Sequence, residues 1–184
     1  DYIIDPEAGL DLSGLGALIA DPAVEKIFHA AEYDLILLKR QYGWKLNNLF
    51  DTMWATRILG IRRCGLANLL ESYFGVSQNK KHQKANWCRR PLSPELLSYA
   101  QMDTHFLIAL ADRLAEELRV ADRLEEAREI FAEQTDVQLP NNGFDPDGFW
   151  SIRAVRDLNG RQRAIVKALY TYRDQQASRQ DRPP

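Results

Sequence analysis

Tyr99 and Asp103 are the residues of this sequence whose types and spacing most directly suggest chemistry. They lie four residues apart in the segment 90–118, whose leucines and alanines recur at helical spacing. Residues four apart lie one turn apart on the same side of a helix. The pair could form a structural hydrogen bond, which is the usual role of buried polar groups and is favoured on spacing alone. It could also be a metal-binding carboxylate beside a phenol that positions water.

Asp34 is the second candidate. Together with Glu32 it opens a predicted helix directly after a predicted strand that ends near His29. This position is the carboxyl edge of an α/β sheet, where ligand sites gather, although the helix dipole alone also favours an acid there. If Asp34 and Asp103 converge, their oxygen atoms favour Mg²⁺ or Mn²⁺ over zinc. A pair of such ions would suit phosphodiester hydrolysis.

A basic segment, residues 80–90, lies between these candidates and contains no acid. Lys84, Arg89 and Arg90 could contact phosphates there, and Trp87 could stack on a base. The same residues could equally form a solvated loop, with Trp87 as a core anchor. The formal net charge of −2 offers no general attraction to nucleic acid, so any such contact must be local.

The composition is that of an ordinary soluble protein, with 45% hydrophobic and 27% charged residues. The two cysteines, Cys64 and Cys88, have no metal-site spacing, and we expect them to be reduced in a cytoplasmic protein. The sequence has no apolar run as long as a membrane span. We therefore expect no membrane association.

Alternating short strands and helices predict an α/β fold that would position these residues. Strands are predicted near residues 2–4, 26–29 and 49–50. Helices are predicted over residues 10–20, 32–42, 51–59, 65–74, 93–118, 119–133 and 159–177, and the segment 138–146 has linker composition. The apolar face of the segment 93–118 is expected to be buried. Because residues 2–5 read as the inside of a strand, we expect the chain to be an internal piece of a larger protein.

Four blocks of this sequence resemble ribonuclease D, a member of the DEDD superfamily of 3′-5′ exonucleases in the branch with a tyrosine in its last motif. They are the runs HAAEYDL at 29–35, LFDT at 49–52, WCRRPLS at 87–93 and YAQMD at 99–103. The resemblance covers about residues 2–135. It implies a ribonuclease H-like exonuclease domain over residues 1–137 that removes nucleotides from RNA 3′ ends, tRNA precursors among them.

The resemblance also implies roles for single residues. Asp34 and Asp103 would help hold two divalent ions, Mg²⁺ or Mn²⁺, and Tyr99 would orient or help deprotonate the attacking water. We interpret Asp51 as a structural cap and His29 as a packing or backbone-bonding histidine. Asp5-Pro6-Glu7 has the spacing of the family's first motif, but Pro6 would stop a strand there.

The first-motif acids, and two strands with them, are therefore expected upstream, and the chain alone is expected to be inactive. After a linker at 138–148, residues 149–184 resemble the first helix of an HRDC domain. Two alternatives stay open. One is an exonuclease of the same superfamily that trims DNA, and the other is a nuclease-like module that only binds nucleic acid. We expect a monomer in either case.

Overall fold

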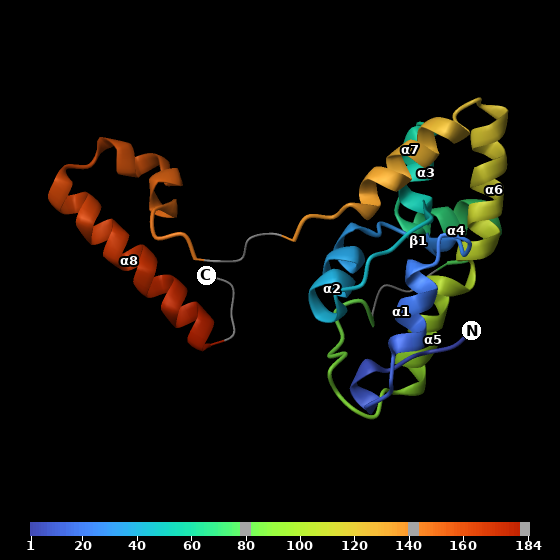
Figure 1. Cartoon of the computed structure of the whole chain (residues 1–184), viewed down its shortest axis with the longest axis horizontal. Coiled ribbons are helices and arrows are strands. Elements are labelled where there is room, and N and C mark those ends of the chain that lie inside the picture. The colour runs from blue at the N-terminus through green and yellow to red at the C-terminus, as the bar shows by residue number, and fades with distance from the viewer. Residues whose placement is uncertain (78–81, 140–143, 181–184) are drawn as a thin grey trace. The chain divides into compact units, whose positions relative to one another are not determined.

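The computed structural model describes residues 1–77, 82–139 and 144–180. The chain forms two compact units, Asp1–Leu139 and Pro140–Pro184 (Figure 1). Within the described residues, no helix is both long enough and apolar enough to cross a membrane.

Two parallel strands form the centre of the first unit. Strand β1 (Lys26–Phe28) pairs with β2 (Leu49–Asp51), so that Lys26 lies opposite Leu49 and Phe28 opposite Asp51. Parallel strands need a crossover connection, and helix α2 (Glu32–Tyr42) supplies it here. Because the strands run in the same direction, their carboxyl ends lie side by side.

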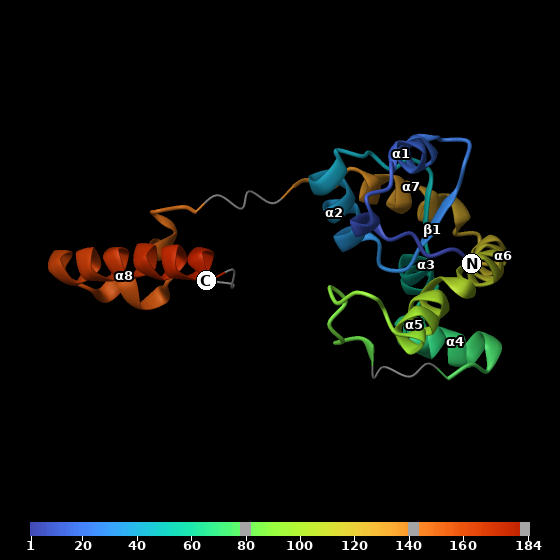
Figure 2. The same ribbon diagram turned by 90° about the horizontal axis from the view of Figure 1, so that it is seen from below.

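Helices surround this pair of strands. Besides α2, the first unit contains the short turn η1 (Pro6–Ala8), α1 (Ser13–Ala20), α3 (Thr52–Ile58), α4 (Leu66–Phe74), α5 (Pro94–His105), α6 (Leu107–Val120) and α7 (Leu124–Thr135). Helices α4 and α5 lie together, on the opposite side of α3 from α1 and α7 (Figure 2). The strands thus have helices on more than one side, as expected for an α/β fold.

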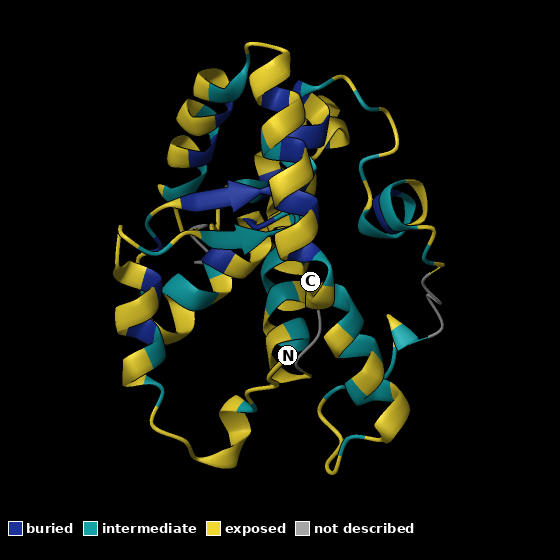
Figure 3. Cartoon of the chain, turned by 90° about the vertical axis from the view of Figure 1, so that its right-hand side faces the viewer, coloured by how far each residue is buried: buried dark blue, intermediate teal, exposed yellow. Residues whose placement is uncertain are grey.

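Helix α6 carries much of the core. Leu110, Leu114 and Leu118 follow one another at intervals of four residues and are fully buried, because this spacing places them on one face of the helix. Figure 3 shows this buried stripe beside β2, which is buried along its whole length. Across the core, the rings of Phe50 and Phe131 lie 5.0 Å apart between centroids and join β2 to α7.

The predicted strand at residues 2–4 is wrong. These residues have no regular secondary structure, and Tyr2 is 97% exposed. A strand is stable only when its backbone groups pair with a neighbour. In the described structure β1 pairs with β2, and Tyr2–Ile4 has no strand beside it.

The single helix predicted over residues 93–118 is two helices. Helix α5 ends at His105 and α6 begins at Leu107, with Phe106 packed against Phe74 at 5.1 Å between ring centroids. The predicted burial fails in α5, which contains no buried residue: Leu96, Leu97 and Ala100 are only half-buried. The next helix is likewise shorter than predicted, since it starts at Leu124.

The second unit contains two short helical turns, η3 (Gly148–Ser151) and η4 (Arg153–Asp157), and helix α8 (Gly160–Arg179). Asn159 and Gln162 form a reciprocal capping box at the start of α8, which explains why the helix begins there. Phe149 and Val155 are buried within this unit. The helix predicted over residues 159–177 is α8, which extends over residues 160–179.

Candidate active site

Asp51 ties the two strand ends together. Its carboxylate is fully buried and accepts hydrogen bonds from the backbone N–H groups of Ala30 at 3.2 Å and Ala31 at 2.8 Å. It also accepts those of Met53 at 2.8 Å and Trp54 at 3.1 Å, which caps α3. The predicted capping role of Asp51 is confirmed. The same side chain holds Ala30 in the left-handed region, with φ 61°, and so shapes the turn that leads into α2.

His29 precedes this turn and is held by Thr52. The Thr52 hydroxyl donates to the carbonyl of Phe28 at 3.0 Å, and His29 Nδ1 lies 3.0 Å from the hydroxyl oxygen of Thr52. Because the hydroxyl proton is already used, Nδ1 must be the donor in this second bond. Burial lowers the pKa of His29, although the charge of Asp51 opposes the shift. The ring is therefore neutral at pH 7, with its proton on Nδ1.

A cavity of about 740 Å³ opens at this edge of the strands. The wall of this cavity contains Asp34 from α2 together with Tyr99 and Asp103 from α5. Asp34 precedes the other two residues by 65 or more positions in the sequence. His29 and Trp87 also contribute to the wall. Further polar residues line the cavity that the sequence analysis did not single out, because no motif or periodicity marks them: Asn68, Gln83 and Thr104.

The electrostatic surroundings of the acid and the phenol differ from those in water. Asp34 is exposed as a residue, but the surrounding protein desolvates its carboxyl and, together with the charge of Asp51, raises its pKa. Desolvation and the nearby charge of Asp103 raise the pKa of Tyr99. Tyr99 is therefore a neutral phenol at pH 7, able to donate a hydrogen bond beside a carboxylate.

Residues 1–119 match the profile of a protein family described as 3′-5′ exonuclease. The chain belongs to this 3′-5′ exonuclease family. Its fold is the ribonuclease H-like fold of these enzymes, which confirms the predicted fold class.

Relatives of known name are similar to this exonuclease chain. It is 34% identical to ribonuclease D of Acidiphilium cryptum, over 98% of the chain and 46% of that protein. It is also 34% identical to exosome complex component 10 of Rattus norvegicus, over 98% of the chain and 21% of that protein. The crystal structure of the catalytic core of RRP6 from Trypanosoma brucei is 31% identical, with a TM-score of 0.75, over 85% of the chain and 44% of that structure. The chain thus spans less than half the length of these relatives.

Asp34 and Asp103 offer carboxylate oxygen atoms, which are the ligands that divalent ions such as Mg²⁺ bind. Across residues 1–77, 82–139 and 144–180, no group of three or more His, Cys, Asp or Glu side chains is arranged to hold a metal. The exonuclease cavity therefore presents two carboxylates in this chain. The chemistry of these two side chains fits a hard cation such as Mg²⁺ or Mn²⁺.

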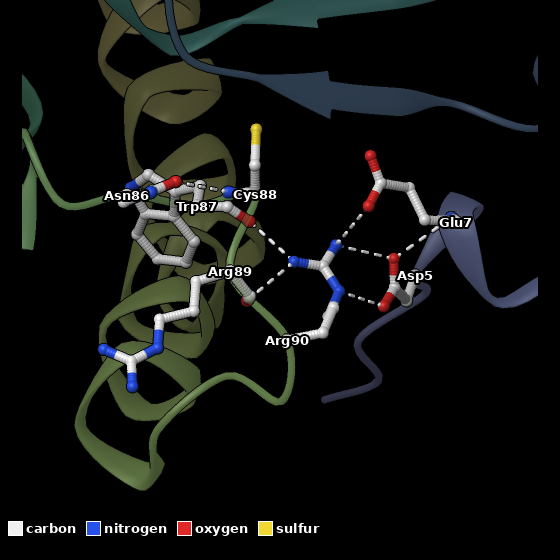
Figure 4. Close-up of polar contacts among 7 residues, drawn as sticks. All are labelled: Asp5, Glu7, Asn86, Trp87, Cys88, Arg89 and Arg90. Atoms are coloured by element: carbon white, nitrogen blue, oxygen red, sulfur yellow. Dashed lines mark hydrogen bonds and ion pairs between the residues drawn. The ribbon is translucent and has the colours of Figure 1, made fainter.

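The four residues predicted to bind nucleic acid lie in three different settings. Lys84 and Arg89 are exposed, whereas Trp87 is half-buried on the cavity wall. The guanidinium of Arg90 instead faces the N-terminal segment and contacts Asp5 and Glu7 (Figure 4). Lys80 and Lys81, the first basic residues of the segment, lie outside the described residues.

Proposed function

We propose that this chain is part of a 3′-5′ exoribonuclease that hydrolyses RNA one nucleotide at a time from its 3′ end, with two divalent metal ions. One observation carries the proposal. In a member of the exonuclease family, Asp34, Tyr99 and Asp103 come from two separate helices and line a single cavity beside the carboxyl ends of the strands. No single segment of the sequence could form that arrangement.

The residues of the cavity have distinct parts in the proposed reaction. Asp34 and Asp103 would bind the divalent ions, which polarise the phosphodiester and lower the pKa of the attacking water. The neutral phenol of Tyr99 would hold that water by a hydrogen bond; desolvation and the nearby charge of Asp103 both raise the pKa of this phenol. By the same resemblance, the two acids of the family's first motif would complete the site.

RNA is the substrate that the names of the relatives support, because these relatives include a ribonuclease D and the exosome complex exonuclease RRP6. We further propose that tRNA precursors are among the substrates, on the resemblance to ribonuclease D alone. Lys84 and Arg89 would contact phosphates, and Trp87 would stack on a base at the cavity wall.

The test is the shortening of a 5′-labelled single-stranded RNA by the full-length protein with Mn²⁺. Asp103→Asn is expected to abolish stepwise shortening, and Tyr99→Phe to reduce the rate by at least ten-fold, which corresponds to about 1.4 kcal/mol or more of transition-state stabilisation. Matched controls are Asp112→Asn, an exposed acid on α6, and Tyr33→Phe, an exposed tyrosine on α2. Both controls should shorten the RNA at the wild-type rate.

The outcomes separate the three candidate functions. Activity that persists in Asp103→Asn contradicts the assignment of the metal ligands. If the wild-type protein shortens DNA but not RNA, it is an exonuclease of the same superfamily that trims DNA. A protein that binds RNA but shortens neither polymer is a binding module.

We also propose that residues 149–184 begin an HRDC-type helical domain that helps hold RNA. The support is the sequence resemblance together with one apolar stripe on α8. Ile165, Leu169 and Tyr172 follow at intervals of four and three residues and are each more than half exposed. Further helices of a bundle would cover such a stripe.

A further inference from the structure

Arg90 is the centre of a polar cluster that joins two distant segments of the first unit. Its Nε lies 2.6 Å from Asp5 Oδ2 and its Nη2 lies 2.8 Å from Asp5 Oδ1, which is a bidentate ion pair. Glu7 adds a second carboxylate at 3.7 Å. The remaining nitrogen, Nη1, donates to the backbone carbonyls of Trp87 at 2.6 Å and Arg89 at 3.2 Å. Figure 4 shows the guanidinium lying between the two segments.

The loop that Arg90 holds carries aromatic rings that pack around Tyr99. The ring of Trp87 lies 6.0 Å from the ring of Tyr99, and the ring of His82 lies 6.1 Å from it. Trp87 is thus connected in two directions: its carbonyl accepts a hydrogen bond from Arg90, and its side chain packs on Tyr99. A shift of Trp87 would change the surroundings of the phenol.

The charges of the cluster argue against a direct role of Arg90 in holding RNA. Asp5 and Glu7 together carry more negative charge than Arg90 carries positive charge, so the cluster offers no net attraction to a phosphate. The bidentate bond also holds the pKa of Asp5 below its usual range. Arg89, by contrast, points its guanidinium away from both acids (Figure 4).

We propose that Arg90 is a positioning residue for Tyr99: tethered by Asp5 and Glu7, it fixes the loop that presses Trp87 against the phenol. The inference rests on the proposed function, because it concerns the residue that would orient the water there. It assigns to Asp5 and Glu7, whose spacing imitates a metal-binding motif, the task of holding an arginine. The N-terminal segment would therefore act on the cavity through the loop and not as a metal ligand.

The first test reads the position of Trp87 without any enzymatic activity. The full-length protein is labelled with 5-fluorotryptophan, and the Trp87 resonance is assigned by Trp87→Phe. Arg90→Gln and Asp5→Asn are both expected to move this ¹⁹F resonance, whereas Arg89→Gln is the matched control and should leave it in place. A Trp87 resonance that is the same in all three variants would overturn the proposal.

The second test separates positioning from RNA contact by the kinetics of RNA shortening. A displacement of about 1 Å at a reacting group can cost up to about 100-fold in rate. Arg90→Gln and Asp5→Asn are each expected to lower kcat about ten-fold with KM changed less than two-fold. The double variant should be no worse than either single variant, because both remove the same tether. Arg89→Gln should instead raise KM.

The opposite assignment makes the opposite prediction for one variant. If Arg90 contacts RNA directly, Asp5→Asn frees its guanidinium and lowers KM, and that result would refute the tether. A wild-type protein without activity would overturn the proposed function, and the fluorine measurement would still decide whether Arg90 positions Trp87. The two failures are thus distinguishable.

Discussion

Asp51 is the residue on which the geometry of the cavity edge depends most directly. Its buried carboxylate accepts four backbone N–H groups, two from the turn before α2 and two from the first turn of α3. An acceptor-only group suits this position, since all four backbone groups that hydrogen-bond to it are donors. Asp34 follows the held turn, so Asp51 determines where α2 begins and places that acid on the cavity wall.

Asp51→Asn is expected to destabilise the protein by about 3 kcal/mol, because the amide nitrogen of Asn brings donors toward donors in a buried site. The free energy of unfolding is measured by urea denaturation. The control is Asp21→Asn, where an exposed carboxylate accepts only the N–H of Ala23 among the bonds described, at 2.8 Å, and Asn can form the same turn bond as Asp. Equal urea midpoints for the two variants would contradict the prediction, because they would mean that the four hydrogen bonds to Asp51 do not stabilise the protein.

At the scale of elements, close packing decides how α1 lies against the rest of the unit. Gly16 is the only buried glycine of this helix, and a methyl group there would approach Trp44 Nε1 to 2.5 Å. Trp44 is itself stacked on Tyr42, with ring centroids 4.5 Å apart. The absence of a side chain at Gly16 thus lets the helix approach the end of α2 and the segment that follows it.

Gly16→Ala is expected to destabilise the protein by about 1–3 kcal/mol, the usual cost of overpacking. Gly14→Ala on the same helix is the matched control, because a methyl group there meets no atom within 4 Å among the described residues. That variant should gain up to about 1 kcal/mol from the higher helix propensity of alanine. Thermal unfolding of both variants gives the comparison, and destabilisation of the same size in both would contradict the contact with Trp44.

At the scale of the whole molecule, two compact units share a formal net charge of −2. Such a charge gives no general attraction to RNA, so under the proposed function the affinity would come from local basic residues such as Lys84 and Arg89 and from the second unit. The exposed stripe on α8 is one apolar feature of the second unit that the described residues leave uncovered.

If an HRDC bundle covers this stripe, Leu169→Asp in the full-length protein should destabilise the second unit by about 2–4 kcal/mol, since a charge would enter a packed interface. Ala164→Asp, an exposed position on the flank of the stripe, is the control and should change stability by no more than about 0.5 kcal/mol. The measurement is the unfolding transition of each variant. A Leu169→Asp variant as stable as its control would mean that nothing packs on the stripe.

Local sequence determined the elements whose signals lie within a few residues. Helix α2 runs over Glu32–Tyr42, as predicted from an apolar face that ends at a glycine, and Ser93 caps α5 with Pro94 in its first position, as its sequence predicts. Four short motifs sufficed for the resemblance to a nuclease family, and the family profile confirmed it. These features depend on neighbouring residues alone, so they can be read from the chain in order.

Tertiary structure decided the rest, because contacts between distant residues outweigh local patterns. The helical pattern runs through Phe106 without a break, but packing of Phe106 on Phe74 accompanies the end of one helix and the start of the next. Residues 2–4 have a strand pattern and no strand to pair with. Arg90 belongs to a basic segment in the sequence, yet its guanidinium forms an ion pair with Asp5, 85 residues away. Its partner, and hence its role, exists only in the folded chain.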